Sequence, residues 1–179
     1  DYIETGSLIS LKQNISDIVI PSEEEHFILN PLDFEEFLWA LGDNVTARVL
    51  KSFFDRKAAV GEVLHRKVMN QFRQYLLVGG MPQAVAEYVK SKDFGKVDFV
   101  KQNILNLYEN DIETQNEENP VYVKNIFLHI PSELSKHDKQ FVLSHIEGAR
   151  RREYKEPIRW LNDAMIVNIA ENVSDPSVA

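Results

Sequence analysis

Side chains that commonly carry enzyme chemistry are present in this sequence, but they do not stand at the spacings that such chemistry requires. The chain has no cysteine, which excludes thiolate catalysis and a disulfide framework. Its five histidines show no metal-ligand spacing, and no Gly-x-Ser-x-Gly motif marks a serine hydrolase. The neighbouring carboxylates Glu35 and Glu36, like Asp111 and Glu113, are typical of solvated helix surfaces. The sequence therefore predicts no metal site and no catalytic residue.

ATP hydrolysis would need two further motifs, and both are absent. Phosphates are held by a loop of the pattern Gly-x-x-x-x-Gly-Lys-Ser/Thr, and Mg²⁺ is held by acidic residues that follow an apolar strand. Neither pattern occurs in the 179 residues. We expect that this chain by itself does not hydrolyse ATP.

A glycine–proline joint, Gly79-Gly80-Met81-Pro82, separates two apolar helix patterns. Glycine accepts the backbone conformations of a sharp reversal. Proline suits the first turn of a helix, because its missing N–H would be unpaired there anyway. Taken alone, these residues indicate a structural turn between two helices.

Helix signals surround this joint. Asp33 and Glu36 have the spacing of a capping box, and apolar residues follow at helical intervals as far as Gly42. Thr46 is a candidate N-cap for the next helix. Further helices are predicted over residues 46–54, 62–78, 82–89 and 97–112, with a polar linker over 90–96.

The last third of the chain has its own pattern. Helices are predicted from Pro120 to about Ile130, over the short segment 131–135, and from Tyr154 to Met165. Weak alternation over residues 166–170 indicates a strand, and short strands are also predicted at 17–20 and 26–29. Helices followed by a terminal strand suggest a winged helix whose second wing strand would follow.

Composition fits a globular protein, with 44% hydrophobic and 27% charged residues. No apolar run approaches the roughly 18 residues of a membrane span, and no secretory signal is visible. We therefore expect a cytoplasmic protein with no membrane partner. Residues 1–7 have the pattern of a strand end whose start is missing, which suggests a fragment of a longer protein.

The net charge of −8 is unevenly distributed. Residues 1–119 carry all of it, and residues 120–179 are neutral overall but contain the basic cluster Arg150-Arg151-Arg152. Bulk electrostatics therefore make the front part a poor nucleic-acid binder.

Four blocks of the chain occur in the order and spacing found in a bacterial and archaeal family of AAA+-like P-loop ATPases. The blocks are Thr5-Gly6-Ser7, Pro31 to Leu38, Gly79 to Pro82, and Tyr108 with Asp111-Ile112. In the family that this chain resembles, the ATPase core is followed by a helical lid and by a domain of unknown function, whose start residues 127–161 resemble. The resemblance implies a mainly α (α+β) chain, containing the C-terminal end of the core as an α/β P-loop remnant (1–30), the lid (31–95), and a linker helix with a winged-helix-like domain (96–179).

The resemblance also implies roles for particular residues. Thr5 and Ser7 match the sensor turn beside the terminal phosphate, and Gly80 and Pro82 match the lid joint, where the proline ring lies against the nucleotide base. ATP and Mg²⁺ are the cofactors of the intact parent, and none is expected on this fragment. The implied partners are the missing N-terminal ATPase core and further copies of the chain. Many members carry a Gly-Arg pair that residues 21–26 lack, so an arginine finger from this loop is not expected.

Two functions follow. In the first, the chain is the lid and C-terminal region of such an ATPase and serves nucleotide sensing and coupling. The alternative is a DNA-binding regulatory module, in which Arg150, Arg151 and Arg152 contact phosphates and Arg159 lies on the recognition helix. Interdomain salt bridges with the acidic front part are the other interpretation of these arginines.

Overall fold

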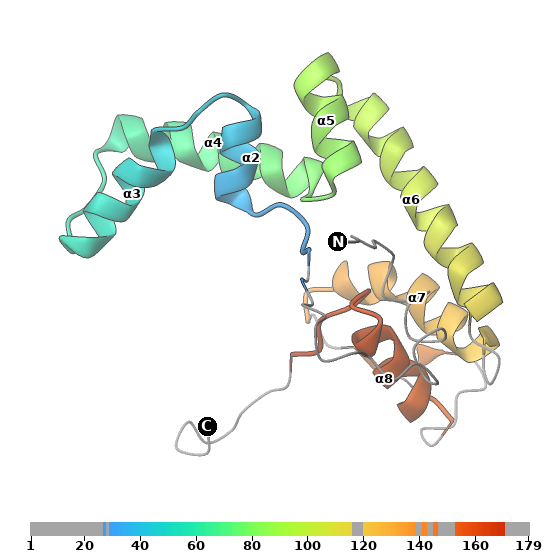
Figure 1. Ribbon diagram of the computed structural model, residues 1–179. Coiled ribbons are helices and arrows are strands. Elements are labelled where there is room, and N and C mark those ends of the chain that lie inside the picture. Colours follow the sequence, from blue (N-terminus) through green and yellow to red (C-terminus); the bar gives the residue numbers. More distant parts are fainter. Residues whose placement is uncertain are drawn as a thin grey trace, which may run out of the picture. The chain divides into compact units, whose positions relative to one another are not determined.

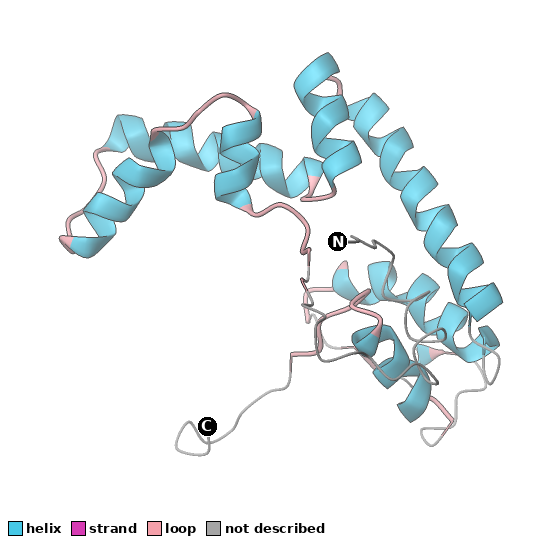
Figure 2. Ribbon diagram, viewed as in Figure 1, coloured by secondary structure: helices cyan, strands magenta, loops and turns pink. Residues whose placement is uncertain are grey.

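A computed structural model of the chain describes residues 27, 29–115, 120–138, 141–142, 145–146 and 153–170. In this part of the chain the regular secondary structure consists of seven α-helices, without a strand (Figures 1 and 2). The prediction of a mainly α chain is therefore confirmed. The described residues form two compact units, an N-terminal unit that ends at Asn106 and a C-terminal unit that begins at Leu107.

The N-terminal unit begins with a helix that its own sequence defines closely. Helix α2 (Phe34–Ala40) starts after Asp33, whose carboxylate accepts from the Glu36 amide at 2.8 Å, while the Glu36 carboxylate accepts from the Asp33 amide at 2.9 Å. This is the predicted capping box. Phe37 and Leu38 are fully buried, which explains how a seven-residue helix persists although isolated short helices are unstable in water.

Four further helices belong wholly or partly to this unit: α3 (Thr46–Asp55), α4 (Glu62–Val78), α5 (Pro82–Ser91) and α6 (Phe94–Gln115). Helix α2 contacts α3, α4 and α5. The core consists of buried side chains from α2, α4, α5 and α6, and aromatic rings of α4 pack at its edge. The buried members are Phe37, Val78, Ala84, Val85, Tyr88 and Val97.

Two helix starts differ from the prediction. Helix α3 begins at Thr46 itself, and its N-cap residue is Val45. The Asp43 carboxylate, two residues before Val45, accepts from the Thr46 amide at 2.9 Å and so satisfies one of the first-turn amides. The predicted linker over 90–96 is wrong, since α6 begins at Phe94. Asp93 explains this early start, because its carboxylate accepts from the Gly95 amide at 2.8 Å, and Gly95 then lies in the first turn.

The C-terminal unit contains the end of α6, helix α7 (Pro120–Leu134) and helix α8 (Lys155–Asp163). Helices α7 and α8 pack together around a second core, and partly buried rings, including that of Trp160, lie against it. Lys124 on α7 forms ion pairs with Glu109 and Glu113 on α6. The buried residues of this core are Ile112, Val123, Ile126, Ile146, Tyr154 and Leu161. Helix α6 therefore contributes to both cores.

Three sequence predictions for this region are wrong. Residues 131–135 do not form a separate helix, because α7 continues through Pro131 to Leu134. The predicted strand over 166–170 is absent, since residues 167–170 are a loop, and α8 ends before Met165, which has a positive φ of 58°. The α/β core remnant and the winged helix remain predictions.

Among the described helices, none is both long and apolar enough to cross a bilayer.

Candidate functional site

The glycine–proline joint between α4 and α5 is a fixed corner of the N-terminal unit. Gly79 has φ +81° and ψ −179°, a conformation that side-chain-bearing residues rarely adopt, and its amide donates to the Tyr75 carbonyl at 2.7 Å. Helix α5 then begins directly at Pro82. The two helices are thus joined by three residues with defined geometry.

Gly80 is required by a close approach to the segment that precedes α2. A Cβ at Gly80 would lie 3.1 Å from the Leu32 nitrogen and 3.1 Å from the Pro31 Cβ, and closer still to the Leu32 carbonyl oxygen. The Leu32 amide donates to the Gly80 carbonyl at 2.7 Å. The Leu32 carbonyl in turn accepts from the Tyr75 hydroxyl at 2.9 Å. Both backbone polar groups of Leu32 are therefore held by residues at or near the joint.

Pro82 occupies the first position of α5 and is exposed. Met81, which precedes it, packs against the core. Gly80 and Pro82 thus lie at one corner, where Gly80 packs closely against Leu32 and Pro82 is exposed.

Of the other predicted site residues, the structure describes Arg159. Thr5, Ser7, and the cluster Arg150, Arg151 and Arg152 lie outside the described residues. Arg159 is exposed on α8.

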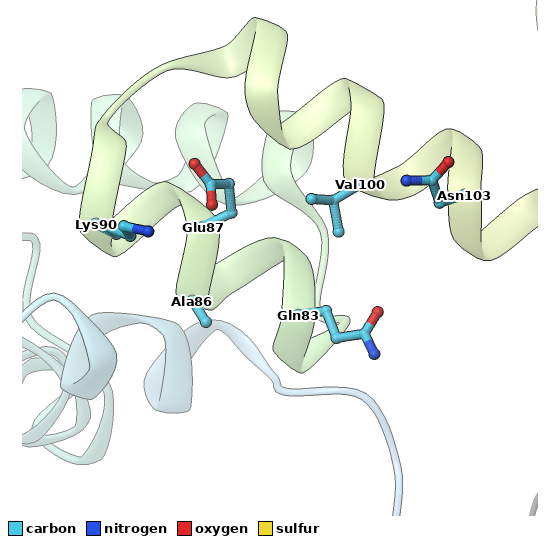
Figure 3. Close-up of a pocket in the computed structure, with 6 residues that line it drawn as sticks. All are labelled: Gln83, Ala86, Glu87, Lys90, Val100 and Asn103. Carbon is cyan, nitrogen blue, oxygen red and sulfur yellow. The ribbon is translucent and has the colours of Figure 1, made fainter.

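Next to the joint, α5 and α6 border an open pocket with a volume of about 390 Å³ (Figure 3). Two amides, from Gln83 and Asn103, lie toward one end, and the charged pair Glu87 and Lys90 lies toward the other. Ala86 and Val100 complete the lining. The lining offers hydrogen-bond donors and acceptors together with one carboxylate and one ammonium group.

A cluster of charged groups surrounds Glu133 near the end of α7. The Glu133 side chain is only 1% exposed, and its carboxylate contacts the ammonium of Lys136, Nδ1 of His145 at 3.0 Å and Nε2 of His129 at 3.4 Å. The hydrogen bond from Lys136 lowers the pKa of Glu133 from its ordinary 4.5 to about 2, and His145 acts in the same direction against the opposing effect of burial. Because Lys136 and His145 already occupy the carboxylate, this cluster is typical of a structural ion-pair network.

A second cluster ties α3 to α4. The carboxylate of Asp43 accepts from the Thr46 hydroxyl at 2.7 Å, from the Lys67 ammonium at 2.9 Å and from the Gln71 amide at 3.3 Å. These donors, with Lys67 first, hold the pKa of Asp43 well below its usual range. The contacts fix the base of the α3–α4 pair on the loop that follows α2.

Sequence reasoning missed both clusters, for a physical reason. His129 and Glu133 are four residues apart, a helical spacing that could have been noticed, whereas His145 is distant in sequence and reaches Glu133 only in the folded unit. Among the described residues, no group of three or more His, Cys, Asp or Glu side chains is arranged to hold a metal ion.

Comparison with known proteins adds a family assignment. Residues 69–179, more than half of the chain, match the family described as Domain of unknown function (DUF8612). The chain belongs to this family. The DUF8612 segment begins within α4, so it includes the Gly79–Pro82 joint, the α5–α6 pocket and the Glu133 cluster, and it excludes α2 and α3. No curated protein and no solved structure matches the chain.

Proposed function

We propose that this chain is the lid and C-terminal region of an AAA+-like P-loop ATPase, in which it senses the bound nucleotide and couples that state to the C-terminal unit. The observation that carries the proposal is the corner at Gly80, which is locked to Leu32 while the adjacent Pro82 stays exposed. ATP and Mg²⁺ would be held by the ATPase core in the parent protein. This chain would contribute the base contact and no catalytic group.

The geometry of the corner favours movement of the lid as one body. Because Leu32 is hydrogen-bonded to both Gly80 and Tyr75, α2, α4 and α5 share one core and one set of backbone contacts. A base that contacts the Pro82 ring would therefore bias the position of three helices together. In this proposal the chain bends outside residues 79–82, and residues 79–82 form the contact with the nucleotide base.

Helix α6 supplies a route for coupling. Val97 belongs to the N-terminal core, and Ile112 of the same helix belongs to the C-terminal core. Lys101 on α6 donates to the Leu77 carbonyl at 2.9 Å, so the C-terminal end of α4 is held by α6 directly. A displacement of the corner would therefore act on the part of α6 that belongs to the N-terminal unit. The same helix continues into the C-terminal unit and could carry the displacement there.

The test is Pro82→Ala in the chain joined to the segment encoded immediately upstream of it. We expect an ATP dissociation constant about five- to tenfold higher, because part of an apolar ring contact with the base is lost. Pro120→Ala is a matched control, since Pro120 also opens a helix but belongs to the other unit, and it should leave the affinity unchanged.

One result would contradict the proposed base contact of Pro82, and another would contradict the ATPase assignment itself. Equal ATP affinity of the Pro82→Ala and Pro120→Ala proteins would remove the base contact. An upstream segment without a phosphate-binding loop would remove the ATPase assignment altogether, and with it the sensor roles proposed for Thr5 and Ser7.

A further inference from the structure

Helix α3 and the first part of α4 form a two-helix arm that lacks a buried core of its own. The arm comprises residues 45–73. From Ala47 to Leu77 no residue is buried, although α3 is strongly amphipathic and carries Val49, Leu50 and Phe53 on one side. At the end of the arm, Phe54 is 82% exposed and Val63 is 86% exposed. Exposed apolar side chains that gather at one place are typical of an interaction surface.

The arm is basic in an otherwise acidic front part. Residues 45–73 carry seven Lys or Arg and two Asp or Glu, a net charge of +5, whereas the other residues of 1–119 carry five and eighteen, a net charge of −13. Lys51 and Lys57 are exposed and form no ion pair with any described residue. The arm therefore presents apolar side chains together with unneutralised positive charge.

The complementary surface is present on the same chain, on α2. The described residues 29–42 contain three acidic residues, Asp33, Glu35 and Glu36, and no Lys or Arg. Glu35 and Trp39 are four residues apart on α2 and therefore share one face, where Trp39 is 49% exposed and Glu35 is exposed. Tryptophan is among the residues that contribute most binding energy at protein interfaces, and the neighbouring carboxylate adds a charge that a basic partner can contact.

These two surfaces do not cover each other within one copy. Trp39 and the end of the arm belong to the same unit, yet both are exposed in it, and in Figure 1 α3 lies on the opposite side of α2 from α5, while α4 passes α2 and reaches the joint with α5. A contact between two copies would bring the exposed lysines of the arm to the Glu35 carboxylate and would cover Trp39 and Phe54. We propose that the arm of one copy docks on the Glu35–Trp39 face of α2 in a second copy.

The chemistry favours this occupant over nucleic acid or lipid. Val45 and Val63 are exposed aliphatic side chains, which neither stack on bases nor hydrogen-bond to phosphates. A lipid surface would explain the charge and the apolar groups of the arm but would leave Trp39 and Glu35 of α2 unexplained. The inference does not depend on the proposed nucleotide role, since neither surface includes Gly80 or Pro82.

The test measures self-association by sedimentation equilibrium up to about 1 mM, the weak end of specific affinity. We expect reversible association that weakens with salt. The double variant Lys51→Glu/Lys57→Glu should raise the dissociation constant about tenfold or more, and Glu35→Lys should do the same, because each places like charges in contact. The chain with all three substitutions should recover association, because the charges are then exchanged across the contact.

Lys96→Glu is the control, since Lys96 is an exposed residue on α6 outside both surfaces. It should leave the dissociation constant within about twofold of that of the unchanged chain. In a Trp160→Phe background, emission from Trp39 should shift to the blue with rising protein concentration, which reports burial of that residue directly. Circular dichroism of each variant checks that helix content is retained.

A chain that stays monomeric across this range would overturn the proposal. A dissociation constant that does not change when the charges at residues 51, 57 and 35 are reversed would overturn it as well. A monomer that binds duplex DNA or vesicles of anionic phospholipid, with binding lost in Lys51→Glu/Lys57→Glu, would assign the arm to that ligand instead of to α2.

Discussion

Replacing Gly80 by alanine should destabilise the N-terminal unit, and the contacts at the corner give the magnitude. The new Cβ would meet the Leu32 backbone closer than 3.0 Å, a separation that side chains do not tolerate. Because the obstacle is a backbone carbonyl, α2 or the joint must shift, and overpacking of this kind costs about 1–3 kcal/mol. The shift also weakens the Leu32–Gly80 hydrogen bond, which contributes about 1 kcal/mol. We expect a total loss of about 2–4 kcal/mol.

Gly61→Ala is the matched control. Gly61 has φ −61° and ψ 151°, which alanine adopts readily, and no atom lies within 4 Å of a Cβ at that position. Alanine is a slightly poorer N-cap than glycine but also restricts the unfolded chain, so the two effects oppose each other. The net change in unfolding free energy should stay within about 1 kcal/mol.

The assay must follow the N-terminal unit alone, because the chain has two compact units and a single unfolding free energy is not defined for both. Trp39 lies in the N-terminal unit and Trp160 in the other, so a Trp160→Phe background leaves Trp39 fluorescence as the specific probe. Urea unfolding gives the free energy. A loss of 2–4 kcal/mol corresponds to a fall in melting temperature of roughly 10–25 °C for a unit of this size.

A thermodynamic cycle with Tyr75→Phe sharpens the result. That variant removes the hydroxyl that donates to the Leu32 carbonyl and should cost about 1 kcal/mol. In the presence of Gly80→Ala it should cost less, because Leu32 is already displaced and the two residues act on the same backbone group. Equal stability of the Gly80→Ala and Gly61→Ala proteins, or full additivity in the cycle, would refute the idea that Leu32 locks the corner.

Two further predictions concern the ionic clusters. Because the pKa of Glu133 is lowered from 4.5 to about 2 in the folded chain, its contribution to stability is present above about pH 4.5 and is lost as the pH falls toward 2. Acid unfolding of the C-terminal unit, followed by Trp160 fluorescence, should therefore be less steep in Glu133→Gln, and an unchanged acid transition would contradict this account. Asp43→Ala should destabilise the N-terminal unit by about 1 kcal/mol through loss of the hydrogen bond from the Thr46 amide, whereas Asp43→Asn, which keeps an acceptor oxygen, should cost less. Urea unfolding compares the two, and equal losses would argue against this hydrogen bond as the cause.

Local signals in the sequence were sufficient to define most helix ends. The capping box of Asp33 and Glu36, the limits of α4 at Glu62 and Val78, and the start of α5 at Pro82 all depend on residues within a few positions of each other. Such signals act on the backbone amides of a single turn and need no tertiary partner. For that reason the mainly helical fold could be predicted from the sequence alone.

The limits of α6 and α7 show where local patterns mislead. Gly95 suggested a linker and Pro131 a break, yet both lie inside helices. At Gly95 the Asp93 carboxylate satisfies the first-turn amides, and along α7 burial of Val123 and Ile126 stabilises a helix that contains a proline. Capping and packing outweigh the propensity cost of the unfavourable residue, which is about 1 kcal/mol for glycine and about 3 kcal/mol for proline inside a helix.

The sequence by itself determined that Gly80 and Pro82 belong to a turn between helices. Glycine widens the range of backbone conformations at its own position, and proline narrows that range to one that suits the start of a helix. Only the tertiary structure decided why residue 80 must be glycine, since the atom that would clash belongs to Leu32, far away in the chain. The same holds for the Glu133 cluster, which His145 joins only after folding. Helices are specified by neighbours in sequence, whereas sites are built from contacts between residues that folding brings together.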